Sequence, residues 1–212
     1  SGFTIGGVDQ GYEPMRLLAD GAQIEDNVIE DGNNLRVWSN NNTIARNSIG
    51  NGYIELLGSY NKILHNKLTG NASIDGAIYV KGSYNLVFGN AIKDVALYVY
   101  YMGIKIKGDN NIVAKNNLTR SGGIEIEIGS NNIMFGNKLL HSGGLYITAG
   151  SDNVFFANHI ENAGVGALVG GYQGRTSNNT LYHNNFINNT EQLGTSYCGY
   201  GSNFDNGREG NC

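Results

Sequence analysis

The sequence predicts an all-β protein folded as a single right-handed parallel β-helix of about eight to nine coils, and two observations predict it. First, an Asn-x-apolar-x-x-Asn phrase recurs every twenty-odd residues, as in the stretch "SNNIMFGNKLL" that begins at Ser130. A recurrence at this period is typical of a solenoid. Second, apolar and polar residues alternate with a period of two around each phrase, which indicates strands, and helical periodicity is absent.

The last Asn of the phrase forms one column of the predicted coils. An Asn at the same turn of every coil can hydrogen-bond to the coils above and below, which satisfies backbone groups that a bend leaves unpaired. We interpret the column as a structural ladder, with a polar stripe that reads sugar hydroxyls as the alternative. Its members are Asn27, Asn47, Asn66, Asn90, Asn116, Asn137, Asn158 and Asn184.

The residue two positions after each Asn of the phrase predicts the core, because it is apolar in every copy, including the first copy, where Ala22 replaces the first Asn. The spacing between the two core columns is odd, so a bend is expected between them. The predicted core residues are Ile24, Ile44, Ile63, Val87, Val113, Met134, Phe155 and Leu181 in one column and Ile29, Ile49, Leu68, Ile92, Leu118, Leu139, Ile160 and Phe186 in the other.

A further strand precedes each phrase, as in "GIKIKG" and "GIEIEIG". Its outward residues place Lys105 opposite Glu125 and Lys107 opposite Glu127, which predicts solvated cross-strand ion pairs. The second of these strands is one residue longer, so a bulge is expected there.

The pattern divides the chain into a β-helix over residues 1–186 and a Gly-rich, Cys-containing tail or cap over residues 187–212. No obvious cap precedes the first strand, and an open strand edge pairs readily with another copy of the chain. The two cysteines, Cys198 and Cys212, are expected to form a disulfide, either within the tail or between molecules.

Composition excludes several function classes. The net charge of −4 and the lack of a Lys/Arg cluster argue against nucleic acid as a partner. No apolar run has the length of a membrane span. We expect an extracellular or cell-surface protein whose signal peptide has been removed, and five glycosylation patterns favour this location. They begin at Asn41, Asn71, Asn117, Asn178 and Asn188.

Two features are candidate contact sites. One long insertion contains Tyr98, Tyr100 and Tyr101, aromatic side chains that either stack on sugar rings or pack against protein. The other is a stripe of outward apolar residues, which is an assembly face unless an insertion or the C-terminal segment covers it. Its principal members are Phe88, Ile112, Phe135, Phe156 and Tyr182.

No catalytic, metal or cofactor residues are predicted. Polysaccharide hydrolysis needs a pair of carboxyl groups in a groove, and elimination needs Asp ligands for Ca²⁺ with a base. Neither cluster is visible among the 18 acidic residues. The histidines do not converge either, since His65 and His183 lie about five coils apart. We therefore expect no enzymatic activity.

The Asn-x-Ile-x-x-Asn coils resemble the NosD/CASH-type repeats, found in carbohydrate-binding proteins, sugar hydrolases and archaeal surface proteins, and the resemblance covers nearly the whole chain. The ending "SNFDNGREGNC" is similar to that of archaeal members. With the uncapped start, the apolar stripe and the terminal Cys, this resemblance implies a structural protein. It would assemble with copies of itself into a sheath, surface layer or filament. The alternative is a carbohydrate-binding or polysaccharide-active protein with glycans as partners, and a third possibility is one piece of a larger secreted protein.

Overall fold

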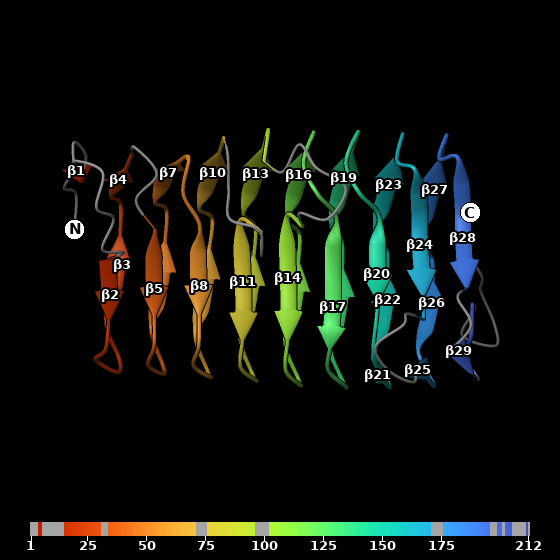
Figure 1. Ribbon diagram of the computed structural model, residues 1–212, viewed down its shortest axis with the longest axis horizontal. Helices are drawn as coiled ribbons and strands as arrows, with labels where there is room; N and C mark the ends of the chain where they lie inside the picture. Colours follow the sequence, from red (N-terminus) through yellow and green to blue (C-terminus); the bar gives the residue numbers. More distant parts are fainter. Residues whose placement is uncertain are drawn as a thin grey trace.

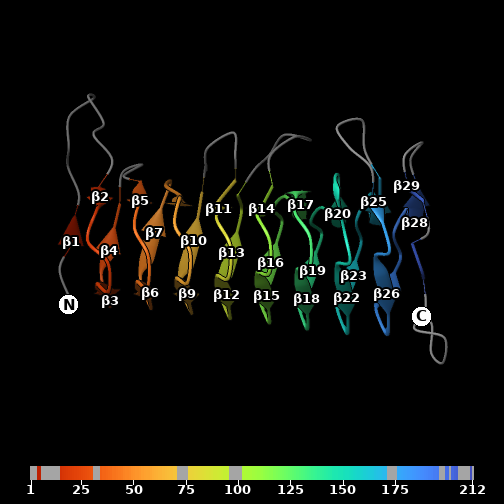
Figure 2. The ribbon, with the colours of Figure 1, turned by 90° about the horizontal axis from the view of Figure 1, so that it is seen from below.

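The computed structural model shows an all-β chain wound into a right-handed parallel β-helix, as the sequence predicts. It describes residues 4–5, 15–30, 34–70, 76–95, 102–170, 176–195, 199–200, 202–204 and 211. Three long sheets run along the molecule, and their strands lie side by side from the N-terminal to the C-terminal end (Figure 1, Figure 2). The described residues contain no helix with the length and hydrophobicity needed to cross a membrane.

The three sheets are built from strands of two to five residues. Sheet A contains β1 (Thr4–Ile5), β4 (Val28–Ile29), β7 (Ser48–Gly50), β10 (Lys67–Thr69), β13 (Ala91–Lys93), β16 (Asn117–Thr119), β19 (Lys138–Leu140), β23 (His159–Glu161) and β27 (Asn185–Ile187). Sheet B contains β2 (Met15–Leu17), β5 (Leu35–Val37), β8 (Ile54–Leu56), β11 (Ile78–Lys81), β14 (Ile104–Lys107), β17 (Ile124–Ile128), β20 (Leu145–Ile147), β24 (Val165–Val169) and β28 (Glu191–Thr195). Sheet C contains β3 (Gln23–Glu25), β6 (Thr43–Ala45), β9 (Lys62–Leu64), β12 (Leu86–Phe88), β15 (Ile112–Ala114), β18 (Ile133–Phe135), β22 (Val154–Phe156) and β26 (Thr180–Tyr182). A small fourth sheet joins β21 (Gly150–Ser151), β25 (Thr176–Ser177) and β29 (Gly199–Tyr200).

Each coil contributes a strand to sheet B, then to sheet C, then to sheet A. We number the coils from β2, β3 and β4 (coil 1) to β24, β26 and β27 (coil 8), and β28 begins a ninth. The pairing is parallel throughout the described strands, so equivalent residues stack: Leu118 lies between Ile92 and Leu139. This agrees with the predicted eight to nine coils.

Aliphatic side chains fill the interior of the helix. Of the predicted core residues, all are buried except Ile24 in coil 1, which is partly buried and packs against the others. Strands of sheet B add two inward residues per coil, such as Ile104 and Ile106, both fully buried. Burial of this continuous apolar column is the main stabilising contribution, at about 25 cal/mol per Å² removed from water.

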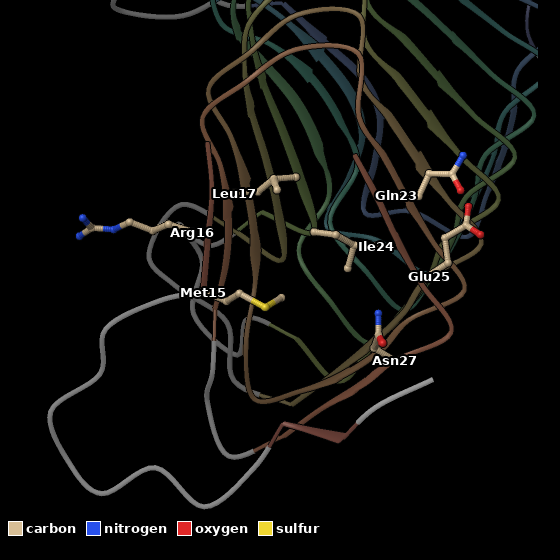
Figure 3. Close-up of a pocket in the computed structure, with 7 residues that line it drawn as sticks. All are labelled: Met15, Arg16, Leu17, Gln23, Ile24, Glu25 and Asn27. Carbon is tan, nitrogen blue, oxygen red and sulfur yellow. The ribbon is translucent and has the colours of Figure 1, made fainter. Parts of the chain in front are cut away.

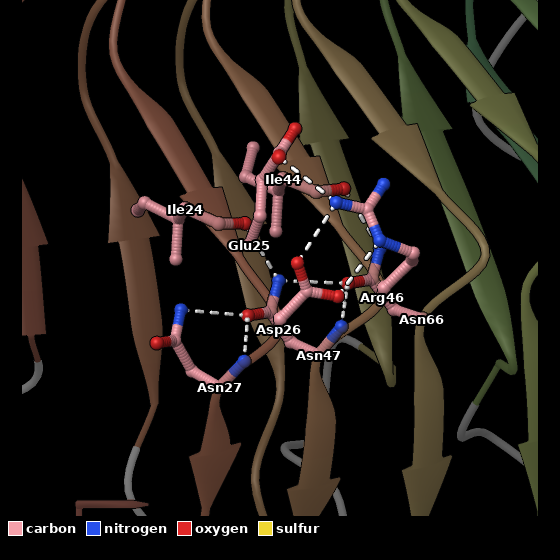
Figure 4. Close-up of polar contacts among 8 residues, drawn as sticks. All are labelled: Ile24, Glu25, Asp26, Asn27, Ile44, Arg46, Asn47 and Asn66. Atoms are coloured by element: carbon pink, nitrogen blue, oxygen red, sulfur yellow. Dashed lines mark hydrogen bonds and ion pairs between the residues drawn. The ribbon is translucent and has the colours of Figure 1, made fainter. Parts of the chain in front are cut away.

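The predicted Asn column forms a hydrogen-bonded ladder at the corner between sheets C and A. The backbone N–H and Nδ2 of Asn66 donate to Oδ1 of Asn90 at 2.9 and 3.0 Å, and Nδ2 also donates to the carbonyl of Ile44 at 2.9 Å. The same pattern starts at Asn27 and Asn47 (Figure 4). Every rung is buried, so the ladder is structural, as predicted.

A second Asn ladder occupies the corner between sheets B and C. Asn42 donates from its backbone and Nδ2 to Oδ1 of Asn61 at 2.8 and 3.0 Å. The exception noted in the sequence, Ala22, still donates its backbone N–H to Oδ1 of Asn42 at 2.8 Å. The Ala therefore removes a side-chain donor and leaves the corner intact.

The expected bend is one residue in the left-handed region immediately before each ladder Asn. Arg46 has φ 54° and Ala157 has φ 53°, and Gly89 takes this place in coil 4 with φ 67°. A left-handed residue turns the chain sharply, which explains the odd spacing between the core columns. For residues other than Gly this conformation costs about 1 kcal/mol, which the ladder bonds offset.

The coiled structure continues past residue 186, where the sequence analysis placed its end. β28 pairs with β24, and Asn203 bridges Thr180 at the end of sheet C. Asn211 adds a rung to the ladder, since it accepts from the backbone and Nδ2 of Asn184 at 3.1 and 2.9 Å. Sequence reasoning missed this rung because Asn203 is in register with Thr180, and Asn211 follows it by eight residues, whereas Asn184 follows Thr180 by four.

Candidate functional site

The outer face of sheet B carries a continuous row of charged and aromatic side chains. They alternate with the core residues of the sheet B strands, and Lys105 stacks directly on Glu125 as predicted. We call this row the polar strip. It comprises Arg16, Arg36, Tyr53, Glu55, Tyr79, Lys81, Lys105, Lys107, Glu125, Glu127, Tyr146 and Thr148.

In coils 2 to 4 the polar strip is a tight network around one carboxylate. Glu55 forms an ion pair with Arg36 on one side, with 2.8 Å between Nε and Oε2, and accepts a hydrogen bond from Lys81 Nζ at 3.1 Å on the other. Arg36 Nη2 also donates to the hydroxyl of Tyr53 at 2.8 Å. The Glu55 side chain is only 11% exposed, so these groups are held in fixed positions rather than freely solvated.

Tyr79 connects the two halves of the polar strip. Its ring is buried, with the Lys81 ammonium 4.4 Å and the Lys105 ammonium 5.7 Å from the ring centroid. Its hydroxyl donates to Oε2 of Glu127 at 3.2 Å. Cations near an aromatic ring are stabilised by its quadrupole, so Tyr79 helps to place two lysines close together.

In coils 5 to 7 the contacts are longer and centre on a bulge. The extra residue of β17 forms the expected bulge, which corrects the predicted column: Ile128, not Glu127, pairs with Lys107. The bulge places the Glu127 carboxylate between two lysines, with Oε2 3.4 Å from Lys105 Nζ and Oε1 3.9 Å from Lys107 Nζ. Bulges commonly re-aim a side chain near a functional site.

Glu125 completes this half of the polar strip. It lies 3.8 Å from Lys105 Nζ and accepts the hydroxyl of Thr148 at 2.6 Å. The predicted ion pairs of Lys105 and Lys107 are thus present. The side chains of Glu125, Glu127 and Lys105 are 13%, 18% and 19% exposed, so they are less solvated than the sequence analysis expected.

Exposed aromatic residues border the N-terminal half of the polar strip, where the chain turns from sheet B to sheet C. Trp38 is 42% exposed, and the guanidinium of Arg16 lies 5.0 Å from its ring centroid. Tyr60 and Tyr84 stack in adjacent coils with centroids 5.0 Å apart. Sequence reasoning missed these residues, although the repeated "GSYN" that contains both tyrosines was a signal.

From coil 4 onward the outer face of sheet C is largely apolar, as the sequence predicted for its stripe. Phe135, Phe156 and Tyr182 stack at 5.1 and 5.4 Å, and Ile112 and Ile133 are each 37% exposed. We call this surface the apolar strip. It comprises Leu86, Phe88, Ile112, Ile133, Phe135, Val154, Phe156 and Tyr182.

The described part of the C-terminal segment does not cover the apolar strip. Asn203 receives the backbone N–H of Leu181 at 2.9 Å and extends the end of sheet C instead. Residues 202–204 and 211 therefore do not fold over the apolar strip, which was one of the alternatives raised from the sequence.

Exposed ion pairs occupy the left-handed corner positions. Arg46 donates to Asp26 from Nε at 2.7 Å and from Nη2 at 2.9 Å, and it also reaches Glu25 (Figure 4). The hydrogen bonds from Arg46 lower the pKa of Asp26 below its usual value. Arg120 lowers the pKa of Asp94 in the same way. The side chains of both pairs are about half exposed and belong to neither strip.

The remaining predicted site residues are scattered. Four of the glycosylation patterns lie at exposed asparagines, Asn41, Asn117, Asn178 and Asn188. Asn71, the tyrosines Tyr98, Tyr100 and Tyr101, and the cysteines Cys198 and Cys212 lie outside the described residues.

A cavity of about 200 Å³ lies at coil 1 (Figure 3). Met15, Leu17 and Ile24 line it and also pack against the core, so it is the end of the apolar interior rather than a polar site. Arg16 and Glu25 stand at its margin and point away from it (Figure 3).

Known proteins share this architecture. A family described as "Periplasmic copper-binding protein (NosD)" has a model that matches residues 19–206. The structure is similar to a double mutant of the tailspike protein of E. coli bacteriophage HK620, with a TM-score of 0.67, 11% identity, and coverage of 86% of this chain and 40% of that chain. A second mutant of that tailspike, in complex with a pentasaccharide, gives a TM-score of 0.55 at 11% identity, with 85% and 48% coverage. No curated protein is significantly similar in sequence.

These likenesses show the fold alone, because identity is so low and one fold serves many functions. The chain also spans less than half the length of the tailspike chains, at 40% and 48%.

The described residues do not fit a copper centre. They contain no group of three or more His, Cys, Asp and Glu placed to hold a metal ion. Copper favours imidazole, thiolate and thioether ligands. Met134 is buried in the core, and His159 Nε2 contacts Glu161 at 3.0 Å, so neither belongs to a cluster of such ligands.

Proposed function

This chain belongs to the NosD family, whose model covers residues 19–206, and from that premise we propose that it is an extracytoplasmic protein that binds polysaccharide along the polar strip. The periplasmic description of the family and the exposed glycosylation patterns favour a location outside the cytoplasm. We further propose that the protein binds without cleaving.

The observation that carries the proposal is the row of half-buried, mutually oriented polar groups on sheet B. Planar and charged groups fixed by neighbours supply directional hydrogen bonds, and aromatic residues at their edge supply apolar contact, the usual composition of a ligand site. Glu55, held between Arg36 and Lys81, is the clearest case of such pre-organisation. Strands stack about 4.8 Å apart, so the row extends roughly 25 Å along the axis from coil 2 to coil 7. An extended polymer fits such a row better than a compact metabolite does.

The arrangement of carboxylates favours binding over hydrolysis. Glycoside hydrolysis needs two carboxyl groups that flank the scissile bond. Glu55 and Glu125 are three coils apart, roughly 14 Å. Glu125 and Glu127 are closer, but both face the same Lys105 ammonium within 4 Å, so a cation stands where the bond would have to lie.

The tailspike likeness gives limited support. One tailspike mutant of this fold is described in complex with a pentasaccharide, which shows that the architecture can present a sugar site. Since the identity is 11%, the sugar contacts of this chain are argued from its own polar strip.

The chain has a built-in probe for the test, because Trp38 is its one tryptophan. We expect saturable changes in Trp38 fluorescence when the protein is titrated with a panel of bacterial and plant polysaccharides. Tyr146→Ala, on the polar strip, should weaken binding, whereas the matched Tyr182→Ala on the apolar strip should not. Because we propose binding without cleavage, the length of the polysaccharide should not change during incubation with the protein. If no polymer alters the emission or retards the protein in affinity electrophoresis, the proposal is wrong.

The apolar strip supports a second candidate function, self-assembly into a sheath, surface layer or filament. Contiguous apolar surface over five coils is unusual on an isolated soluble protein. Sedimentation velocity and negative-stain microscopy should then show oligomers that the double variant Phe135→Ser, Phe156→Ser abolishes. Dissociation by reductant would assign an intermolecular role to Cys198 and Cys212. A monomer under all conditions would contradict this candidate.

A further inference from the structure

Like charges lie directly opposite each other at two places on sheet B. Arg16 pairs in register with Arg36, and Lys81 with Lys107. Like charges directly opposite in a sheet are destabilising. Among the described strand pairings these two are the only such steps between acidic or basic residues, and both are cationic. The charged corner columns show the reverse arrangement, since Asp26 stacks with Arg46 and Asp94 with Arg120.

The polar strip is therefore cationic on an acidic protein. Its described residues include five bases and three acids, whereas the whole chain has 14 bases and 18 acids. The bases are Arg16, Arg36, Lys81, Lys105 and Lys107, and the acids are Glu55, Glu125 and Glu127. Opposite charges are thus present nearby but do not fully neutralise the row.

The lysine step has room for an incoming anion. Lys107 is 47% exposed and lies 3.9 Å from Glu127, which is longer than a hydrogen bond. Lys105 lies 3.4 Å from Glu127, and Lys81 lies one coil below Lys107. Lys105 and Lys107 thus share Glu127, and the Lys81 ammonium is held at 3.1 Å by Glu55, a carboxylate that it shares with Arg36, so the bases of this region outnumber its carboxylates. The bulge at Glu127 holds this arrangement by placing one carboxylate near both Lys105 and Lys107.

We infer that the polysaccharide is anionic and that its acidic groups bind at the two cationic steps, one at Lys81 and Lys107 and the other at Arg16 and Arg36. This inference rests on the proposed function and specifies its ligand class. The steps are three coils apart, roughly 14 Å, so a chain that runs along the axis would present acidic groups to both. A carboxylate or sulfate would add acceptor oxygens to those that the strip already supplies, and it relieves the repulsion within each step.

The test uses matched polymers in affinity electrophoresis. Polygalacturonate and its methyl ester share a backbone and differ in charge, and dextran sulfate and dextran form the equivalent sulfated pair. We expect each charged polymer to retard the protein more than its neutral partner, less so as salt rises. Lys107→Gln should weaken binding of the charged polymers about tenfold. Lys138→Gln, an exposed lysine on sheet A, is the matched control and should change nothing.

A stability measurement separates binding from a structural role. Removing one member of a like-charge pair should leave the Tm of Lys107→Gln unchanged or slightly raised. A clear fall in Tm would show that Lys107 serves the fold and would overturn the inference.

The remaining outcomes are distinguishable. Equal retardation by charged and neutral partners overturns the inference and leaves the proposed function standing. Equal retardation by duplex DNA reduces the effect to unspecific charge and also overturns it. If none of the polymers binds, the proposed function itself fails.

Discussion

The outer faces of sheets B and C are made by the same coils and the same strand geometry, yet their chemistry is opposite. On sheet B, Lys105 and Glu125 stack in one column. On sheet C, Phe135 of coil 6 and Phe156 of coil 7 stack in the equivalent way. The interior behind both faces is uniformly apolar. The difference teaches that inward and corner positions hold the fold, whereas outward positions are available for contacts with other molecules.

The first and largest prediction removes what both faces share. Asn116→Ala deletes the acceptor of Asn90 N–H and Nδ2 at 2.9 and 3.0 Å and the donor to the Val87 carbonyl at 3.0 Å. These groups are buried, so we expect a loss of about 3–5 kcal/mol in the free energy of unfolding, measured with urea. Asn117→Ala changes the exposed neighbour and should stay within about 0.5 kcal/mol. Equal effects for the two variants would mean that the ladder is not what stabilises the corner.

The success of the sequence in predicting this ladder has a physical reason. A rung needs one residue type, because only Asn combines an Oδ1 acceptor and an Nδ2 donor at this reach. The core columns need apolar side chains in every coil. Both requirements recur each turn and therefore leave a periodic pattern. Asn211 escaped prediction because the last coil breaks the period, although the same contacts form there.

The contacts on the outer faces were harder to predict, because no single residue type or side-chain contact recurs there in every coil. The pairing of Lys105 with Glu125 followed from the register, but its burial did not. Glu127 was assigned to the wrong column, since only the structure shows how the bulge shifts β17. The apolar strip was predictable because outward apolar residues contradict the strand alternation, and such exceptions mark functional surfaces.

The second prediction concerns the turn at the end of each sheet B strand, where coils approach most closely. A Cβ on Gly129 would lie inside contact distance of the Gly108 carbonyl, a backbone group that cannot move aside. Gly129→Ala should therefore lower the free energy of unfolding by about 2–3 kcal/mol. Gly164→Ala is the control, since a Cβ there meets nothing within 4 Å. Thermal unfolding of both variants decides the question, and a neutral Gly129→Ala would show that the coils can separate.

The third prediction sharpens the contrast between the two faces. Phe156 stacks on both Phe135 and Tyr182, so Phe156→Ala should cost about 1–2 kcal/mol in a monomer. If the apolar strip is an interface, the wild-type Tm rises with protein concentration and the variant loses that dependence. Tyr146→Ala on sheet B leaves the apolar strip intact, so its Tm should keep the same concentration dependence as the wild type. A concentration-independent wild-type Tm would leave the apolar strip as a surface of the monomer.

The smallest effect is expected at the corner pairs, which lie outside both faces. Because hydrogen bonds from Arg46 lower the pKa of Asp26 in the folded state, the ionised carboxylate stabilises the fold above the ordinary Asp pKa, and this contribution is lost as pH falls through the lowered value. The Tm difference between wild type and Asp26→Asn should therefore be greatest near neutral pH and vanish in strong acid. Asp94→Asn, which removes the equivalent partner of Arg120, should behave alike. Since both pairs lie at the surface with side chains about half exposed, salt should shrink the difference, and a difference that persists in high salt would indicate a role beyond the ion pair.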